Sequence, residues 1–157
     1  MKYNLIKMKR YFILLALTLL CSMIYAQKQT TAYFEFIYDC TLVNTSNNTK
    51  RNSWSYEYEN DKKGVQIAID VKINPNGEDY PKELLAGMVT NTGYIKTSIG
   101  TFKKLYAAVS TGETQGYYLR KATFNTKHKM YIVSVVGTNK ELTSAVYKQL
   151  EQTFITK

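Results

Sequence analysis

The feature that most constrains the fold is an alternation of large apolar and polar residues between positions 54 and 73. Aromatic residues occupy every second position from Trp54 to Tyr58, and apolar, mostly β-branched residues do the same from Val65 to Ile73. Successive side chains of a β-strand point to opposite faces of the sheet, so a period of two predicts two strands. The polar segment 61–64 predicts a turn between them, and the two strands therefore form a hairpin with one buried face.

Further strands are predicted where aromatic and β-branched residues cluster. Such clusters cover 32–43, 94–99, 102–109, 116–124 and 129–136. Segments rich in Asn, Ser, Thr and Gly separate them, which predicts a loop over 44–49 and turns over 74–77, 110–112 and 125–128. Together with the hairpin, these segments predict an antiparallel sheet of six or seven strands.

Two helices complete the predicted fold. Pro81 begins a short one, which ends near 91–93. Thr138 and Glu141 have the spacing of a capping box, which predicts a long helix over about 139–154 with one apolar stripe along it. The predicted fold class is α+β, with the short middle helix and the long C-terminal helix packed on the sheet.

The amino-terminal residues have the three regions of a secretory signal peptide. A basic stretch ends at Arg10, an apolar run follows, and a small-residue cleavage site ends at Ala26. The apolar stretch up to Ala26 is 16 residues long, shorter than the roughly 20 needed to cross a bilayer. We predict a signal peptide over 1–26 and one domain over 27–157, periplasmic or secreted, with no transmembrane segment after cleavage. Met8 is an alternative start of translation.

Removal of this signal would change the composition of the chain. The net charge would fall from +9 to +5, because 17 basic and 12 acidic residues would remain. The basic residues lie in short, dispersed groups, so we expect no nucleic-acid partner. Cys21 would be lost with the signal, and Leu20 before it argues against lipid attachment there. Cys40 would remain as the one cysteine, so no internal disulfide is predicted.

The inventory of reactive residues is short. The one histidine, His128, lies between two lysines in a predicted turn, and one histidine with one cysteine cannot make a zinc site. The segment 72–83 has a spacing that is similar to a calcium loop, but Lys72 occupies the position that needs an anionic ligand. Glu57 and Glu59 are the candidates for paired carboxylates. We therefore name no catalytic residue, metal ligand or cofactor, and a non-enzymatic protein is favoured without being decided.

The order of elements in the last 90 or so residues resembles the PsbP/Mog1-like fold. The segments that carry this likeness are 81–85, 100–109, 116–119, 130–133 and 150–154. The resemblance implies a non-catalytic accessory or binding protein, and it transfers no site residues. The junction of Ala26 and Gln27 resembles signals common in Bacteroidota, which implies a protein of the bacterial envelope.

Two surfaces are candidates for binding. If the alternating aromatics of 54–58 are exposed, they form a flat stacking platform; if they are buried, Glu57 and Glu59 are simply the solvent face. Exposed tyrosines and basic loops could form the second surface. The candidate binding residues are Trp54, Tyr56, Tyr58, Tyr117, Lys103, Lys104 and Arg120.

The sequence therefore predicts an exported, non-enzymatic binding or accessory module of the bacterial envelope. Its partner would be an envelope protein or a glycan. Two alternatives remain open: a small periplasmic hydrolase that uses carboxylates, and an exported immunity or inhibitor protein.

Overall fold

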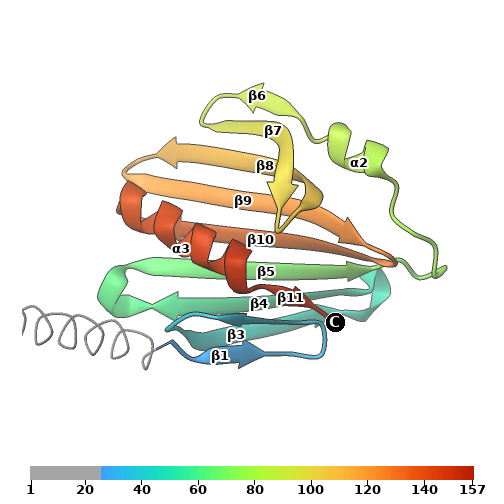
Figure 1. The fold of residues 1–157 in the computed structure, drawn as a ribbon, viewed down its shortest axis with the longest axis horizontal. Helices are drawn as coiled ribbons and strands as arrows, with labels where there is room; N and C mark the ends of the chain where they lie inside the picture. The colour runs from blue at the N-terminus through green and yellow to red at the C-terminus, as the bar shows by residue number, and fades with distance from the viewer. Residues whose placement is uncertain (1–25) are drawn as a thin grey trace, which may run out of the picture.

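The structure is a computed structural model that describes residues 26–157, and it contains two antiparallel sheets and two α-helices (Figure 1). The large sheet has eight strands in the order β3-β4-β5-β10-β9-β8-β7-β6, and the small one has the order β1-β2-β11. In chain order, the elements are β1 Lys28–Thr30, β2 Phe34–Ile37, β3 Thr41–Asn48, β4 Ser53–Asn60, β5 Val65–Ile73, α2 Lys82–Ala86, β6 Thr90–Thr92, β7 Ile95–Phe102, β8 Leu105–Thr114, β9 Tyr117–Thr126, β10 Lys129–Gly137, α3 Lys140–Thr153 and β11 Ile155–Thr156.

The predicted hairpin is β4 and β5, joined by the short 3₁₀-helix Asp61–Lys63. The apolar positions of β5 from Val65 to Val71 are buried at every second residue, as the alternation predicts. They face α3 and the small sheet, and we call this side of the large sheet its inner face. The other side is its outer face.

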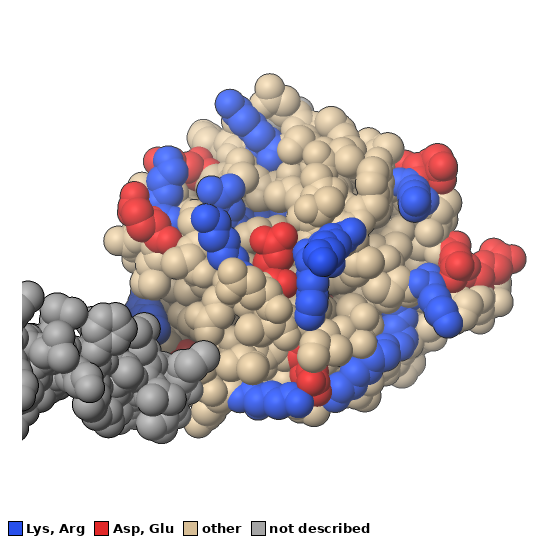
Figure 2. All heavy atoms as spheres, in the orientation of Figure 1, with Lys and Arg blue, Asp and Glu red and all other residues tan. Residues whose placement is uncertain are grey.

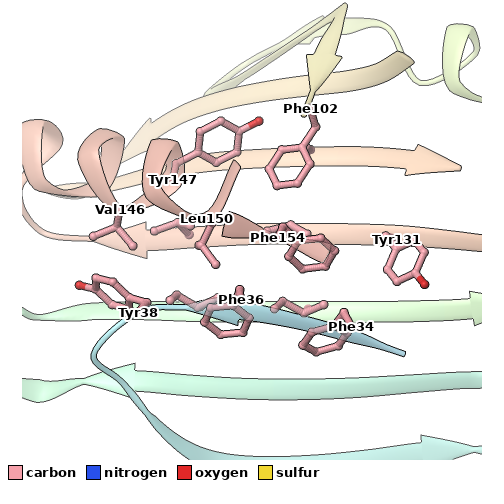
Figure 3. Close-up of a cluster of buried hydrophobic side chains, with 14 of the residues drawn as sticks. Phe34, Phe36, Tyr38, Phe102, Tyr131, Val146, Tyr147, Leu150 and Phe154 are labelled. Atoms are coloured by element: carbon pink, nitrogen blue, oxygen red, sulfur yellow. The ribbon is translucent and has the colours of Figure 1, made fainter. Parts of the chain in front are cut away.

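A cluster of aromatic rings fills the space between the inner face, α3 and β2 (Figure 3). At its centre lies Phe154, which is 2% exposed. Its ring centroid lies 5.4 Å from Phe34, 5.7 Å from Phe102, 5.9 Å from Phe124 and 6.0 Å from Tyr131. Since these rings come from β2, β7, β9 and β10, the Phe154 side chain links the small sheet to three strands of the large sheet.

α3 begins close to the inner face, and a glycine makes this approach possible. A Cβ atom on Gly137 would lie 2.7 Å from Thr143 Oγ1 on the second turn of α3. The N-cap is Asn139, whose side chain accepts a hydrogen bond from the Leu142 amide at 2.8 Å. The predicted cap at Thr138 is therefore wrong by one residue.

α2 packs on the outer face, across the sheet from α3. The Asn125 side chain of β9 points outward and donates to the carbonyl groups of Tyr80 and Pro81, which lead into α2. Leu85 of α2 is 1% exposed. The two helices thus lie on opposite faces of the sheet.

Several predicted boundaries are wrong. The strand predicted over 32–43 is divided into β2 and β3, and β3 continues through most of the loop predicted over 44–49. The turn predicted over 110–112 lies inside β8, which is paired along that stretch with β7 and β9. The actual turn between β8 and β9 is Gln115 and Gly116, with φ of 48° and 79°. The strand predicted over 102–109 is interrupted by a further turn at Lys103 and Lys104, between β7 and β8. The mixed α+β class is confirmed, but the large sheet has eight strands instead of six or seven.

The predicted signal peptide lies outside the described residues, apart from its last residue, Ala26. Between residues 26 and 157, no helix is long and apolar enough to cross a membrane.

Candidate binding site

A groove of about 720 Å³ lies on the outer face, over β7, β8 and β9. Its floor is hollow because three successive outward positions of β8 carry small side chains, at Ala108, Ser110 and Gly112. A larger residue at Gly112 would have little room, since a Cβ atom there would lie 3.1 Å from the Tyr94 carbonyl oxygen. The groove is therefore shaped by the residue types of one strand.

The walls of the groove are mainly apolar. Tyr94, in the turn before β7, is 72% exposed, and Tyr117, at the start of β9, is 52% exposed. The lining also includes Met88, Ile95, Leu119 and Val136. Large apolar side chains that are exposed next to one another on a soluble protein usually mark an interaction surface.

A small polar centre lies on the floor. The hydroxyl groups of Thr97 and Ser110 form a hydrogen bond of 2.9 Å, and Lys121 is directly opposite Ser110 in the strand register. Glu113 also lines the groove, but its carboxylate forms an ion pair with Lys140 at 3.7 Å. The groove thus combines an apolar lining with one amine, and it lacks the two carboxyl groups that a glycoside hydrolase places around its substrate.

The side chains with perturbed pKa values lie away from the groove. Burial raises the pKa of the Cys40 thiol to about 12 and the pKa of the Tyr38 phenol to about 12. Burial also raises the pKa of Tyr58 and Tyr147. A thiol with such a pKa is protonated at neutral pH, so Cys40 behaves as a small apolar residue of the core. Within residues 26–157, no group of three or more His, Cys, Asp and Glu could hold a metal ion.

The three alternating aromatics of β4 lie on the inner face. Trp54 packs against Tyr33 with a centroid distance of 4.9 Å, and Tyr58 packs edge-on against Phe36 at 5.1 Å. Tyr56 packs edge-on against Phe34, and Tyr58 is only 2% exposed. An exposed platform of three rings is therefore not formed.

The acidic residues of the same strand lie on the outer face. Glu57 accepts a hydrogen bond from Asn44, and Glu59 accepts one from Gln66. This is the arrangement that the sequence predicts for the case in which the aromatics are buried.

The other predicted binding residues are not brought together. Tyr117 lines the groove, whereas Arg120 points to the inner face, where its Nε donates to Ser144 Oγ at 3.3 Å. Lys103 and Lys104 form the turn between β7 and β8, and the Lys103 amine donates to the Phe154 carbonyl oxygen. On the face that carries α3, basic side chains lie in separate groups with acidic ones between them (Figure 2).

The large antiparallel sheet with one long C-terminal helix on its inner face defines an α+β protein with a PsbP-like fold. No family model matches the chain, and no curated protein is similar to it in sequence.

Two solved structures carry the comparison. A protein from Bacteroides thetaiotaomicron superposes with a TM-score of 0.55 and 14% identity, over 85% of this chain and 49% of its own. The chain thus spans about half the length of that protein. The cyanobacterial PsbP protein CyanoP from Synechocystis superposes with a TM-score of 0.55 and 7% identity, over 85% of this chain and 94% of its own. At these identities the likeness shows the fold alone, and at that level the predicted PsbP-like resemblance is confirmed.

Proposed function

We propose that the protein is an exported, non-enzymatic binding module of the bacterial envelope, and that its groove receives an apolar group of a protein partner. The observation that carries this proposal is the open groove of about 720 Å³ with exposed tyrosines at its rim. The PsbP-like fold is consistent with an accessory module.

The lining favours a protein partner over a glycan. Sugar rings stack on aromatic faces but also need many hydrogen-bond partners for their hydroxyl groups, and the surface of this groove is mainly apolar. Tyrosine and methionine are enriched at protein interfaces, and Tyr94, Tyr117 and Met88 all line the groove. An aliphatic or aromatic side chain of a partner would therefore replace water at little polar cost.

The geometry also argues against the carboxylate hydrolase. Glu57 and Glu59 are hydrogen-bonded to neighbouring side chains on the outer face, and Glu113 is paired with Lys140. Glu57 and Glu59 line a separate hollow of about 210 Å³, which is much smaller than the groove, and Glu57 and Glu113 are exposed to solvent. A binding groove requires no pair of catalytic carboxyl groups.

The groove is tested by photo-crosslinking in the native cells. The full chain carries a benzoyl-phenylalanine in place of Tyr117, and a matched protein carries it in place of Lys148, which is exposed on α3. We expect one partner to be linked from position 117 and not from position 148.

A charge placed in the groove should then abolish this adduct. Leu119→Glu puts a carboxylate among the apolar lining, whereas Leu84→Glu puts the same group on the exposed side of α2. Circular dichroism checks that both variants are folded. The proposal is overturned if both variants retain the adduct, or if position 148 gives the same adduct as position 117.

Export is tested separately, by mass spectrometry of the amino terminus of the protein purified from its own cells. We expect the first residue to be Gln27. A mature protein that retains residues before Ala26 would contradict the predicted cleavage.

A further inference from the structure

β3 is an edge strand that the chain leaves open. It is first in the order of the large sheet and pairs only with β4 (Figure 1). All eight residues from Thr41 to Asn48 are exposed, including Leu42 at 45% and Val43 at 50%. Within residues 26–157, no backbone hydrogen bond joins β3 to any strand other than β4. One row of its amide and carbonyl groups is therefore available to another chain.

The sequence of β3 does little to protect this edge. Exposed edges are usually blocked by charged residues, by proline or by short length. β3 contains no charged residue and no proline over eight residues, and its irregularity lies near one end, between Leu42 and Asn44. The opposite edge, β6, has only three residues. Of the two edges of the large sheet, β3 is thus the one suited to pairing.

The charges at the two ends of β3 indicate what pairs with it. Asp39 lies before the strand, and Lys50 and Arg51 follow it in the short 3₁₀-helix Thr49–Arg51. These three side chains are exposed, and none has an ion-pair partner in the part of the chain that the structure describes. When two copies of such a strand run antiparallel, the acidic end of each lies beside the basic end of the other. β3 is therefore complementary in charge to a second copy of itself.

We propose that β3 pairs antiparallel with β3 of a second copy of this chain, about a two-fold axis. In the register that places Thr41 opposite Asn48, the bulge residue Val43 of each copy is unpaired and Thr45 lies opposite Thr45 of the other copy, so that opposed side chains share a face. Asp39 of one copy then lies next to the 3₁₀-helix of the other copy that carries Lys50 and Arg51. A two-fold axis repeats every contact, so both ends of the paired strands would place a carboxylate beside an amine. An unrelated extended peptide would explain the open edge but not this distribution of charge.

The dimer goes beyond the proposed function because it uses a different part of the molecule. The groove lies over β7, β8 and β9, on the far side of β5 and β10 from β3. Pairing at β3 would leave it open. Because the axis is perpendicular to the sheet, the outer faces of both copies would look the same way, and the two grooves would open on one side.

The test is the mass of the protein in solution, measured by sedimentation equilibrium on the full chain as purified from cells that express it with its own export sequence. We expect a dimer at low salt that weakens as salt is raised. Asp39→Lys and Lys50→Asp each place like charges opposite one another at both ends, and each should weaken dimerisation by about tenfold or more. The variant with both changes restores opposite charges and should restore the dimer.

Lys148→Asp is the matched control, since it makes the same charge change on the exposed face of α3 and should leave the dimer intact. A wild-type protein that is monomeric at high concentration overturns the proposal. So does a dimer that is unaffected by both single changes, or a double variant that remains monomeric. The photo-crosslink from the groove can be measured in the monomeric variants, so failure of one proposal is distinguishable from failure of the other.

Discussion

Replacing Phe154 with alanine tests whether the aromatic cluster holds the two sheets together. Phe154 is 2% exposed and touches rings from four strands, so its removal leaves a cavity where β2, β7, β9 and β10 meet. The neighbouring elements cannot all collapse into that space at once. The variant should therefore keep most of this cavity and lose most of the contacts that the ring makes.

The magnitude follows from the burial. A fully buried aromatic side chain removes about 150–250 Å² from water, which corresponds to about 4–6 kcal/mol at about 25 cal/mol per Å². Phe→Ala changes in cores cost about 3–5 kcal/mol. We expect a fall of about 4 kcal/mol in the free energy of unfolding, which is a large part of the roughly 5–15 kcal/mol typical of a domain. For a domain of the size that residues 26–157 form, this loss corresponds to a fall of about 14 °C in Tm.

The assay is urea unfolding followed by the fluorescence of Trp54, the one tryptophan of the sequence, which packs against Tyr33. Phe154→Leu keeps part of the side-chain volume and should lower the free energy of unfolding by about 1.5 kcal/mol or less. Its unfolding can therefore be measured even if the alanine variant does not fold. The neighbouring Ile155→Ala is the matched control, because Ile155 is 48% exposed and should cost less than about 1 kcal/mol. A loss below about 2 kcal/mol for Phe154→Ala, or an equal loss for Ile155→Ala, would refute the reasoning.

Two further predictions concern close packing and burial. Gly137→Ala should lower the free energy of unfolding by about 1–3 kcal/mol, because its Cβ would lie 2.7 Å from Thr143 Oγ1. Gly87→Ala meets nothing closer than 3.6 Å and should be neutral, so equal effects in thermal melts would contradict this account. Cys40 should resist a thiol reagent at pH 8 until urea unfolds the protein, since burial raises its pKa to about 12. The folded state binds the thiol proton of Cys40 more tightly than the unfolded state does. The contribution of this thiol to the free energy of unfolding is therefore fully present below about pH 8.5 and is lost as the pH rises towards 12. The urea midpoint should therefore fall more steeply with pH in this range for the wild type than for Cys40→Ala. Equal slopes of the urea midpoint against pH for the two proteins would contradict this prediction.

Sequence patterns predict the elements whose two sides have different surroundings. β5 alternates because one face meets the core and the other meets solvent, and α3 carries an apolar stripe for the same reason. Such patterns depend on neighbours along the chain. They say little about pairing between distant segments, so β1, β6 and β11, which have two or three residues each, were not predicted.

The groove was missed for a specific reason. Ser110 and Gly112 are typical turn residues, and the sequence therefore predicts a turn at the place where they form the floor. The true turn after β8 lies further along the chain, at Gln115 and Gly116. The turn before β8, at Lys103 and Lys104, was also missed, because both lysines have positive φ whereas such two-residue hairpin turns usually contain Asn and Gly. A hydrogen bond from the Lys103 amine to the Phe154 carbonyl oxygen helps to hold it. This contact spans about 50 positions of sequence and has no local signature.

The pairing of β11 with β2 also has a consequence for the order of folding. β11 pairs with β2 through Ile155 and Thr156, and the Lys157 amide donates to the Tyr33 carbonyl oxygen at 2.8 Å. One edge of β2 and the centre of the aromatic cluster are therefore completed by residues that lie near the other end of the described chain. Contacts between such distant positions close a long loop, and proteins rich in them fold slowly. We therefore expect the small sheet and the aromatic cluster to form late, after the local hairpins of the large sheet.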